Sequence, residues 1–161
     1  MWLWQAAGMR MKGNDVGNYE TLNELLVRLF RDVMDIEQKS IITPEFKDIT
    51  NNDMHVIEAI GIGAPKNMSA IARELSVTVG TLTIAMNSLV KKGYVERTRG
   101  QEDRRVVYIS LSERGRRAYE NHARFHREMI QSVTSELTEE ETEILVKSLS
   151  KLNQWFRSRQ D

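Results

Sequence analysis

The three histidines are the side chains with the clearest potential for chemistry. His122 and His126 lie four residues apart, so on a helix both would face one side, a spacing that can hold a transition-metal ion. The sequence offers no second ligand pair and no HExxH pattern, and the neighbouring Arg124 and Arg127 would disfavour a cation. We therefore predict no metal site. His55 is predicted to face the inner side of its helix as a hydrogen-bonded packing residue, although a place in a ligand pocket stays open.

Other catalytic motifs are missing from the sequence. It holds no GxSxG, no P-loop and no GxGxxG, so the usual settings for acyl transfer and for phosphate or dinucleotide binding are not expected. The absence of cysteine excludes disulfides, zinc fingers and thiol catalysis. No stretch reaches the roughly 18 apolar residues that a membrane span requires. We expect a cytoplasmic protein that is not an enzyme, uses no cofactor and contacts no membrane.

A run of hydroxyl and amide side chains between residues 79 and 92 suits the recognition of DNA bases. Leu82, Met86 and Leu89 recur at helical steps and predict a buried face, so the opposite face carries the polar side chains. Threonine and asparagine can bond base edges, and isoleucine can touch a thymine methyl group. The alternative is an ordinary solvated face, but weak helix formers are uncommon there. We predict DNA contacts from Ser69, Thr78, Gly80, Thr81, Thr83, Ile84, Asn87 and Ser88.

Three arginines gather in the polar loop that follows this helix. Arg99, Arg104 and Arg105 lie within seven residues, and a guanidinium group suits a phosphate or a narrow minor groove. Asp103 is predicted to hold one of these arginines in a fixed orientation through a charge-assisted hydrogen bond. The alternative is a charged hairpin tip that only keeps the loop soluble.

The charge distribution also points to a polyanionic partner. The whole chain has 23 basic and 23 acidic residues, but residues 66–127 hold 13 basic and 6 acidic side chains. The remainder of the chain holds 10 basic and 17 acidic residues. A basic segment within an acidic protein is typical of nucleic-acid binding, and random scatter of surface charge is the alternative.

The elements that would position these side chains follow from apolar periodicity and capping residues. Thr50, Asn67 or Ser69, Ser112 and Thr138 are predicted N-caps. Helices are predicted over 19–39, 50–60, 69–75, 79–92, 112–137 and from 138 onward, with a tight turn at 76–78 and β-runs at 94–98 and 106–111.

This order predicts a mainly α fold with a small β-hairpin wing: a winged helix-turn-helix with a helical dimerisation region. The apolar stripes over 22–36 and 144–156 are too long for one small lobe to cover, so a homodimer is expected. We divide the chain into a loose N-terminal tail (1–18), a helical dimerisation region (19–45 and 112–161) and a DNA-binding lobe (46–111).

The segments that carry these side chains resemble those of a known family. The run from Ile71 to Arg97 resembles the helix-turn-helix of MarR-type regulators. Asp103-Arg-Arg105, with the following β-run and Gly115, resembles their wing signature. The resemblance covers roughly residues 19–159. It implies an obligate dimer in which the first and the last two helices interlock, and a ligand pocket between the dimer core and the DNA-binding lobe. Because a symmetric dimer presents two recognition helices, we expect it to bind double-stranded DNA at a palindromic operator.

Three shorter segments, 46–57, 79–83 and 124–126, look like the FabT branch of that family. The resemblance implies a repressor of fatty-acid synthesis genes whose DNA binding is strengthened by acyl groups on acyl carrier protein. The expected acyl contacts are Leu29, Val33, Ile36, Met54, His55, Ile57, Phe125 and Met129, and the expected carrier-protein contacts are Arg116, Arg117, Arg124 and Arg127.

Two other functions stay open: a MarR-type regulator of a small aromatic or other apolar ligand, and a winged-helix module that binds protein. The apolar residues named as acyl contacts could also simply be core.

Overall fold

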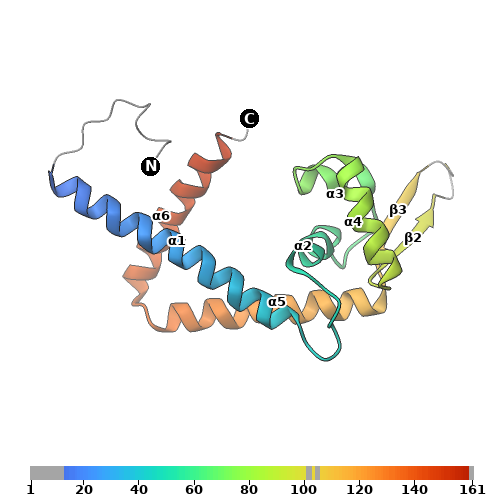
Figure 1. The fold of residues 1–161 in the computed structure, drawn as a ribbon, viewed down its shortest axis with the longest axis horizontal. Coiled ribbons are helices and arrows are strands. Elements are labelled where there is room, and N and C mark those ends of the chain that lie inside the picture. The colour runs from blue at the N-terminus through green and yellow to red at the C-terminus, as the bar shows by residue number, and fades with distance from the viewer. Residues whose placement is uncertain (1–12, 101–102, 104–105, 160–161) are drawn as a thin grey trace.

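The computed structural model describes residues 13–100, 103 and 106–159. The helices and short strands of residues 51–111 gather into one lobe, two long helices extend from it, and the last helix follows at the far end of the second long helix (Figure 1). In chain order the elements are α1 (Gly13–Ile41), α2 (Asn51–Ile60), β1 (Lys66–Asn67), α3 (Met68–Glu74), α4 (Val79–Lys91), β2 (Val95–Arg99), β3 (Val107–Leu111), α5 (Glu113–Ser135) and α6 (Glu139–Arg157). The prediction of a mainly helical fold with a small β wing is confirmed.

The core of the lobe lies between α2, α3, α4 and the sheet. Leu82, Met86 and Leu89 are all buried, as their helical spacing predicts, and they pack in one cluster with residues of α2 and the sheet. The sheet has the order β1-β3-β2, and both pairings are antiparallel. β1 was not predicted, because a two-residue strand is too short to show the alternation on which strand prediction depends.

Local capping signals mark the helix starts correctly. Thr50 forms a capping box with Asp53, and Thr138 forms another at the start of α6. Asn67, rather than Ser69, caps α3, because its side chain accepts a hydrogen bond from the backbone N–H of Ala70 at 2.8 Å. Between α3 and α4, Ser76 adopts a left-handed conformation (φ 54°) that makes the predicted tight turn.

α1 begins earlier than predicted. It starts at Gly13, so residues 13–18, which were assigned to the loose tail, are helical, while residues 1–12 lie outside the described part of the chain. Residues 13–18 carry no periodic apolar pattern that could have signalled a helix. A formed helix can still extend through them, because each added residue gains one backbone hydrogen bond without a new nucleation step.

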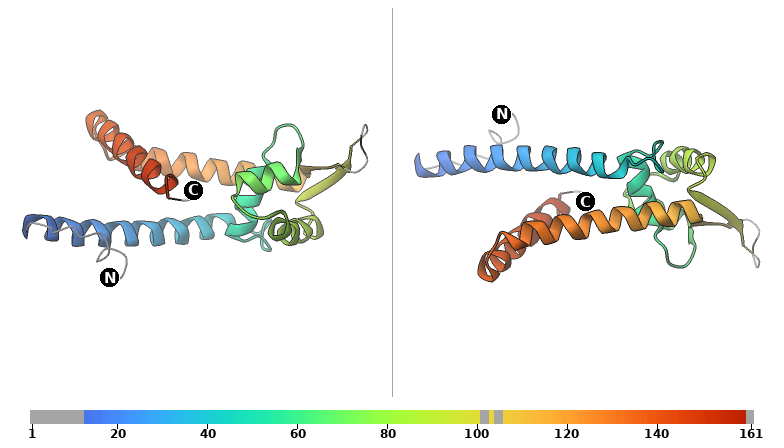
Figure 2. Two further views of the ribbon diagram at one scale, coloured as in Figure 1. Left: turned by 90° about the horizontal axis from the view of Figure 1, so that it is seen from above. Right: turned by 90° about the horizontal axis from the view of Figure 1, so that it is seen from below.

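α5 connects the lobe to the extended helices. It contacts α1, α2 and β3, and Gly115 in its first turn lies directly against the backbone carbonyl of Tyr94. α1 and α5 leave the lobe on the same side, and the β2–β3 hairpin lies at the opposite end (Figure 2). Within the described residues, no helix has the length and apolar character that crossing a bilayer demands.

Candidate nucleic-acid interface

α4 presents its polar face to solvent. Thr81, Thr83, Ile84 and Asn87 are exposed, and Ile84, at 75%, is the most exposed large apolar side chain in the described part of the chain. Thr78 and Gly80 at the start of the helix and Ser69 on α3 are exposed as well, while Ser88 is half-buried. The predicted contacts on α4 therefore share one accessible face, with Ser88 at its margin.

The threonine hydroxyls on this face also bond to the helix itself. Thr78 is the N-cap of α4 and accepts a hydrogen bond from the backbone N–H of Thr81 at 3.1 Å. The Thr78 and Thr81 hydroxyls lie 2.9 Å apart, and the Thr83 hydroxyl donates to the Val79 carbonyl at 2.7 Å. With its proton directed to the backbone, Thr83 offers DNA a hydroxyl acceptor and a methyl group.

Asn87 is held by a residue that the sequence analysis missed. Arg97 on β2 donates from Nη2 to Asn87 Oδ1 at 2.7 Å. This bond occupies the amide oxygen and orients the amide N–H groups, so Asn87 is set to donate to acceptors on a base edge. Strand alternation puts Arg97 on the same face as the buried Val95, so the sequence carried no signal for this contact, and its pairing with α4 depends on how the strand packs.

The wing is described only in part. Arg99 at the end of β2 is exposed, whereas Arg104 and Arg105 lie outside the described residues. Asp103 is exposed, and its carbonyl accepts a hydrogen bond from the backbone N–H of Val106 at 3.1 Å. The expected role of Asp103 in orienting an arginine remains a prediction.

A polar network anchors the end of α4 to the rest of the lobe. Lys92 forms an ion pair with the buried Asp53 at 2.7 Å. The Tyr94 hydroxyl donates to Asp48 at 2.8 Å, and Arg114 of α5 contacts both the Asp48 carboxylate and the face of the Tyr94 ring. Burial opposes ionisation of Asp48, but the bond from Tyr94 and the charge of Arg114 bring its pKa below the ordinary value. Burial, together with the Asp48 carboxylate, raises the pKa of Tyr94 well above its ordinary value.

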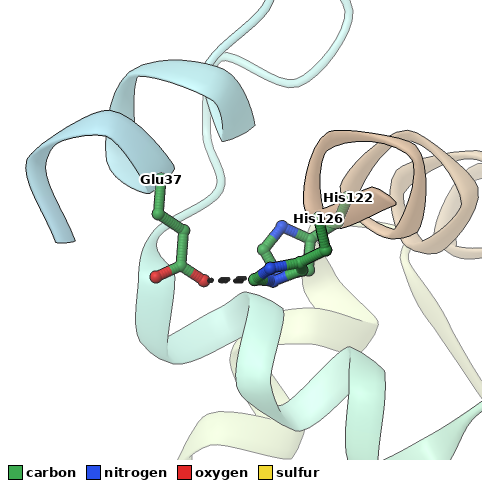
Figure 3. A group of neighbouring side chains, drawn as sticks. All are labelled: Glu37, His122 and His126. Carbon is green, nitrogen blue, oxygen red and sulfur yellow. Dashed lines mark hydrogen bonds and ion pairs between the residues drawn. The ribbon is translucent and has the colours of Figure 1, made fainter. Parts of the chain in front are cut away.

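The two histidines of α5 have an acidic partner that sequence analysis did not find. Glu37 of α1 lies beside His122 and His126, so a third ligand-type side chain accompanies the predicted pair (Figure 3). Glu58 of α2 also contacts His122 at 3.2 Å, and the hydrogen bond between them is the main cause of a lowered Glu58 pKa. The pairing was invisible in the sequence because Glu37 lies 85 residues before His122.

The prediction for His55 was wrong. Its side chain is 49% exposed and contacts Glu58 at 3.4 Å, so it lies on the outer side of α2. Met54 and Ile57 are 1% and 0% exposed and belong to the core of the lobe. They therefore fill the core and do not line an open ligand cavity in this conformation. A residue adjacent to a core position on a helix points about 100° away from it, which explains the exposure of His55.

The other expected acyl contacts lie on α1 and α5. Leu29 and Ile36 are exposed, and Val33, Phe125 and Met129 are half-buried. The structure thus does not bring all eight residues around one space.

Three of the four arginines expected to contact carrier protein line one open hollow of about 460 Å³. Arg117, Arg124 and Arg127 share it with Phe46 and Glu45. Arg117 donates a hydrogen bond to Glu45 at 2.7 Å, and this carboxylate offsets the positive charge that Arg117 brings to the hollow. Arg116 is directed elsewhere and donates to the carbonyl of Ile62 at 3.4 Å.

Known proteins share this architecture. The sequence pattern described as MarR family matches residues 47–106. The structure of Streptococcus pneumoniae FabT in complex with DNA is 38% identical, with a TM-score of 0.82, over 87% of this chain and 98% of that chain. The S. aureus MepR–DNA complex is 27% identical, with a TM-score of 0.63, over 80% of this chain and 96% of that chain.

Among curated proteins, the Bacillus subtilis HTH-type regulator YwhA is 36% identical over 84 residues, which are 52% of this chain and 60% of YwhA. The chain therefore spans about three fifths of that relative, whereas it spans nearly all of FabT. Since the match to FabT extends through the helices outside the lobe as well as the lobe itself, the chain belongs to the MarR family, whose members are DNA-binding transcriptional regulators rather than enzymes.

Proposed function

We propose that this protein is a homodimeric repressor of fatty-acid biosynthesis genes and that acyl-acyl carrier protein strengthens its binding to DNA. The observation that carries the proposal is the likeness to FabT, at 38% identity over 98% of the FabT chain. A likeness of that extent includes the extended helices as well as the DNA-binding lobe.

The exposed apolar side chains of α1 and α6 support the dimer. α6 buries no residue, although Ile144, Leu149 and Phe156 lie along it. On α1, Leu25 and Phe30 are also exposed. Apolar faces of this extent are unfavourable in water, and a symmetry-related copy would cover them. A monomer by light scattering at micromolar concentration would contradict this part of the proposal.

A symmetric dimer would place two α4 helices in successive major grooves. The half-sites of its operator would then be centred about 34 Å apart, one turn of DNA. Footprinting should show a two-fold symmetric site, and protection of a single asymmetric half-site would contradict the arrangement.

Base recognition is assigned to the exposed face of α4. The Asn87→Ala variant should lose about 1–3 kcal/mol of discrimination at one base pair, because its amide donors are removed. Arg97→Ala should relax the same position, since Arg97 orients that amide. Competition binding against operators mutated at each position measures both effects, and an unchanged preference in Asn87→Ala would refute the assignment.

The arginine-lined hollow supports an acidic partner protein. Three arginines, Arg117, Arg124 and Arg127, outnumber the acidic Glu45 and Glu120 in its lining, so the hollow carries a net positive charge. The acyl chain itself would contact the half-buried Val33, Phe125 and Met129 and the exposed Leu29 and Ile36. Met54, His55 and Ile57 are no longer included, because two of them are core residues and His55 faces solvent.

The test is DNA binding in the presence of carrier protein. Fluorescence anisotropy with DNA from upstream of fatty-acid genes would be measured with free carrier protein and with carrier protein bearing acyl chains of increasing length. Each buried methylene contributes about 0.8 kcal/mol, so the enhancement should grow with chain length until the binding space is filled. An equal response to free and acylated carrier would remove the corepressor and leave a MarR-family regulator with another ligand.

Charge variants identify the carrier surface. The double variant Arg124→Ala/Arg127→Ala should lose the enhancement while keeping the affinity for DNA alone. Lys147→Ala, which removes an exposed charge of α6, is the control and should respond as the wild type does. Full enhancement in the double variant would exclude this surface as the carrier contact.

A further inference from the structure

Glu37, His122 and His126 form a group of ligand-type side chains that the DNA-binding face does not use. His122 Nε2 lies 3.3 Å from Glu37 Oε1, and His126 Nε2 lies 3.8 Å from the same oxygen. The two Nε2 atoms are 2.9 Å apart. All three atoms converge between α1 and α5 (Figure 3).

These separations match those of ligands around one small cation. A tetrahedral zinc ion with bonds of about 2.0–2.1 Å keeps its ligand atoms about 3.3–3.4 Å apart. The three measured separations, from 2.9 to 3.8 Å, lie around that value. Glu58 Oε1 of α2 is 3.2 Å from His122 Nε2, so a second carboxylate lies beside the group.

The charge of the group also favours a cation. Glu37 is 5% exposed and His122 is 1% exposed, so a carboxylate and an imidazole are withdrawn from water together. His122 Nε2 faces two carboxylate oxygens and a second imidazole nitrogen, but it can donate only one hydrogen. A divalent cation accepts lone pairs from Glu37, His122 and His126 at once, and its charge balances those of Glu37 and the neighbouring Glu58.

The arginines that argued against a cation in the sequence lie on the other side of α5. At about 100° per residue, Arg124 and Arg127 point about 200° and 140° around the helix from His122, whereas His126 points only about 40° away. Both arginines line the hollow beside Phe46. Neighbours in sequence are therefore separated in space, and the objection does not hold.

We propose that Glu37, His122 and His126 bind a divalent transition-metal ion, and that Zn²⁺ suits this nitrogen and oxygen donor set. The ligands come from α1 and α5, and Glu58 of α2 contacts one of them, so a bound ion would fix the lobe relative to the extended helices. In a dimer, the angle between the lobe and the extended helices determines the separation of the two α4 helices. Metal binding would therefore alter the affinity for DNA. This inference does not depend on an acyl corepressor.

Zinc binding by the full-length, metal-stripped protein tests the site. Titration against a chromophoric zinc chelator should give one ion per chain. Replacing a residue that hydrogen-bonds to a metal ligand typically lowers metal affinity by about 10–100-fold. Glu37→Gln and His126→Ala replace the ligands themselves, so each should weaken zinc binding by at least about 100-fold. Glu128→Gln makes the same chemical change as Glu37→Gln at an exposed position of α5 and should retain the bound ion. Equal zinc affinity in the His126→Ala and wild-type proteins would overturn the assignment.

Two further measurements separate a metal site from loss of folding and test its effect. His126 is partly exposed, so His126→Ala should show a wild-type circular dichroism spectrum without zinc. Zinc should raise the melting temperature of the wild type and not that of this variant. Zinc should also change the DNA affinity of the wild type by about 5-fold or more and that of His126→Ala by less than 2-fold. An unchanged wild-type DNA affinity at saturating zinc would overturn the coupling.

Discussion

Replacing Asp53 by alanine should lower the free energy of unfolding by about 2–4 kcal/mol. Asp53 is buried, and its Oδ2 atom accepts hydrogen bonds from the backbone N–H of Thr50 at 3.0 Å, from the Thr50 hydroxyl at 2.9 Å and from Lys92 Nζ at 2.7 Å. One carboxylate therefore joins the start of α2 to the end of α4.

The magnitude follows from these three bonds. Loss of a capping interaction costs about 0.5–2 kcal/mol, and a hydrogen bond to a charged group contributes about 1.5–3 kcal/mol. Lys92 retains partial access to water and can be rehydrated, so its contribution falls at the lower end of that range. The Thr50 hydroxyl still accepts from the N–H of residue 53, so half of the capping box survives.

Urea unfolding followed by circular dichroism at one fixed protein concentration measures the change. A double-mutant cycle with Lys92→Met should give a coupling energy of about 1–2 kcal/mol between the two side chains. Glu96→Ala, which removes an exposed acidic side chain of the same lobe, should change stability by less than about 0.5 kcal/mol. A loss below about 1 kcal/mol for Asp53→Ala, or strictly additive effects in the cycle, would refute the reasoning.

Three further outcomes are expected. Gly115→Ala should destabilise the protein by about 1–3 kcal/mol or more, because the added Cβ would overlap the Tyr94 carbonyl; an unchanged melting temperature would be inconsistent with that contact. Arg99→Ala should weaken binding to all DNA sequences and reduce the slope of log K against log salt by about 1, and an unchanged slope would exclude a phosphate contact. The lowered pKa of Asp48 means that its bonds with Tyr94 and Arg114 stabilise the fold above the unfolded-state pKa and are lost as the pH falls through the folded-state value. The stability advantage of the wild type over Asp48→Asn should therefore shrink below about pH 4, and a constant difference in acid denaturation would contradict it.

The sequence alone determined the local architecture of this protein. The caps at Thr50, Ser112 and Thr138, the buried face of α4 and the tight turn before it were all predicted correctly. Each of these signals is contained within a few consecutive residues. Helical periodicity and side-chain capping act over one or two turns, so their outcome does not depend on the rest of the chain.

Only the tertiary structure decided which distant side chains meet. It brought Glu37 to His122, and it turned His55 outward next to the core residue Met54. These outcomes depend on the rotation of each helix and on the angle at which α1 and α2 pack against α5. Packing of the whole core sets both quantities, and for that reason residues 85 positions apart can share one site without any signal in the sequence between them.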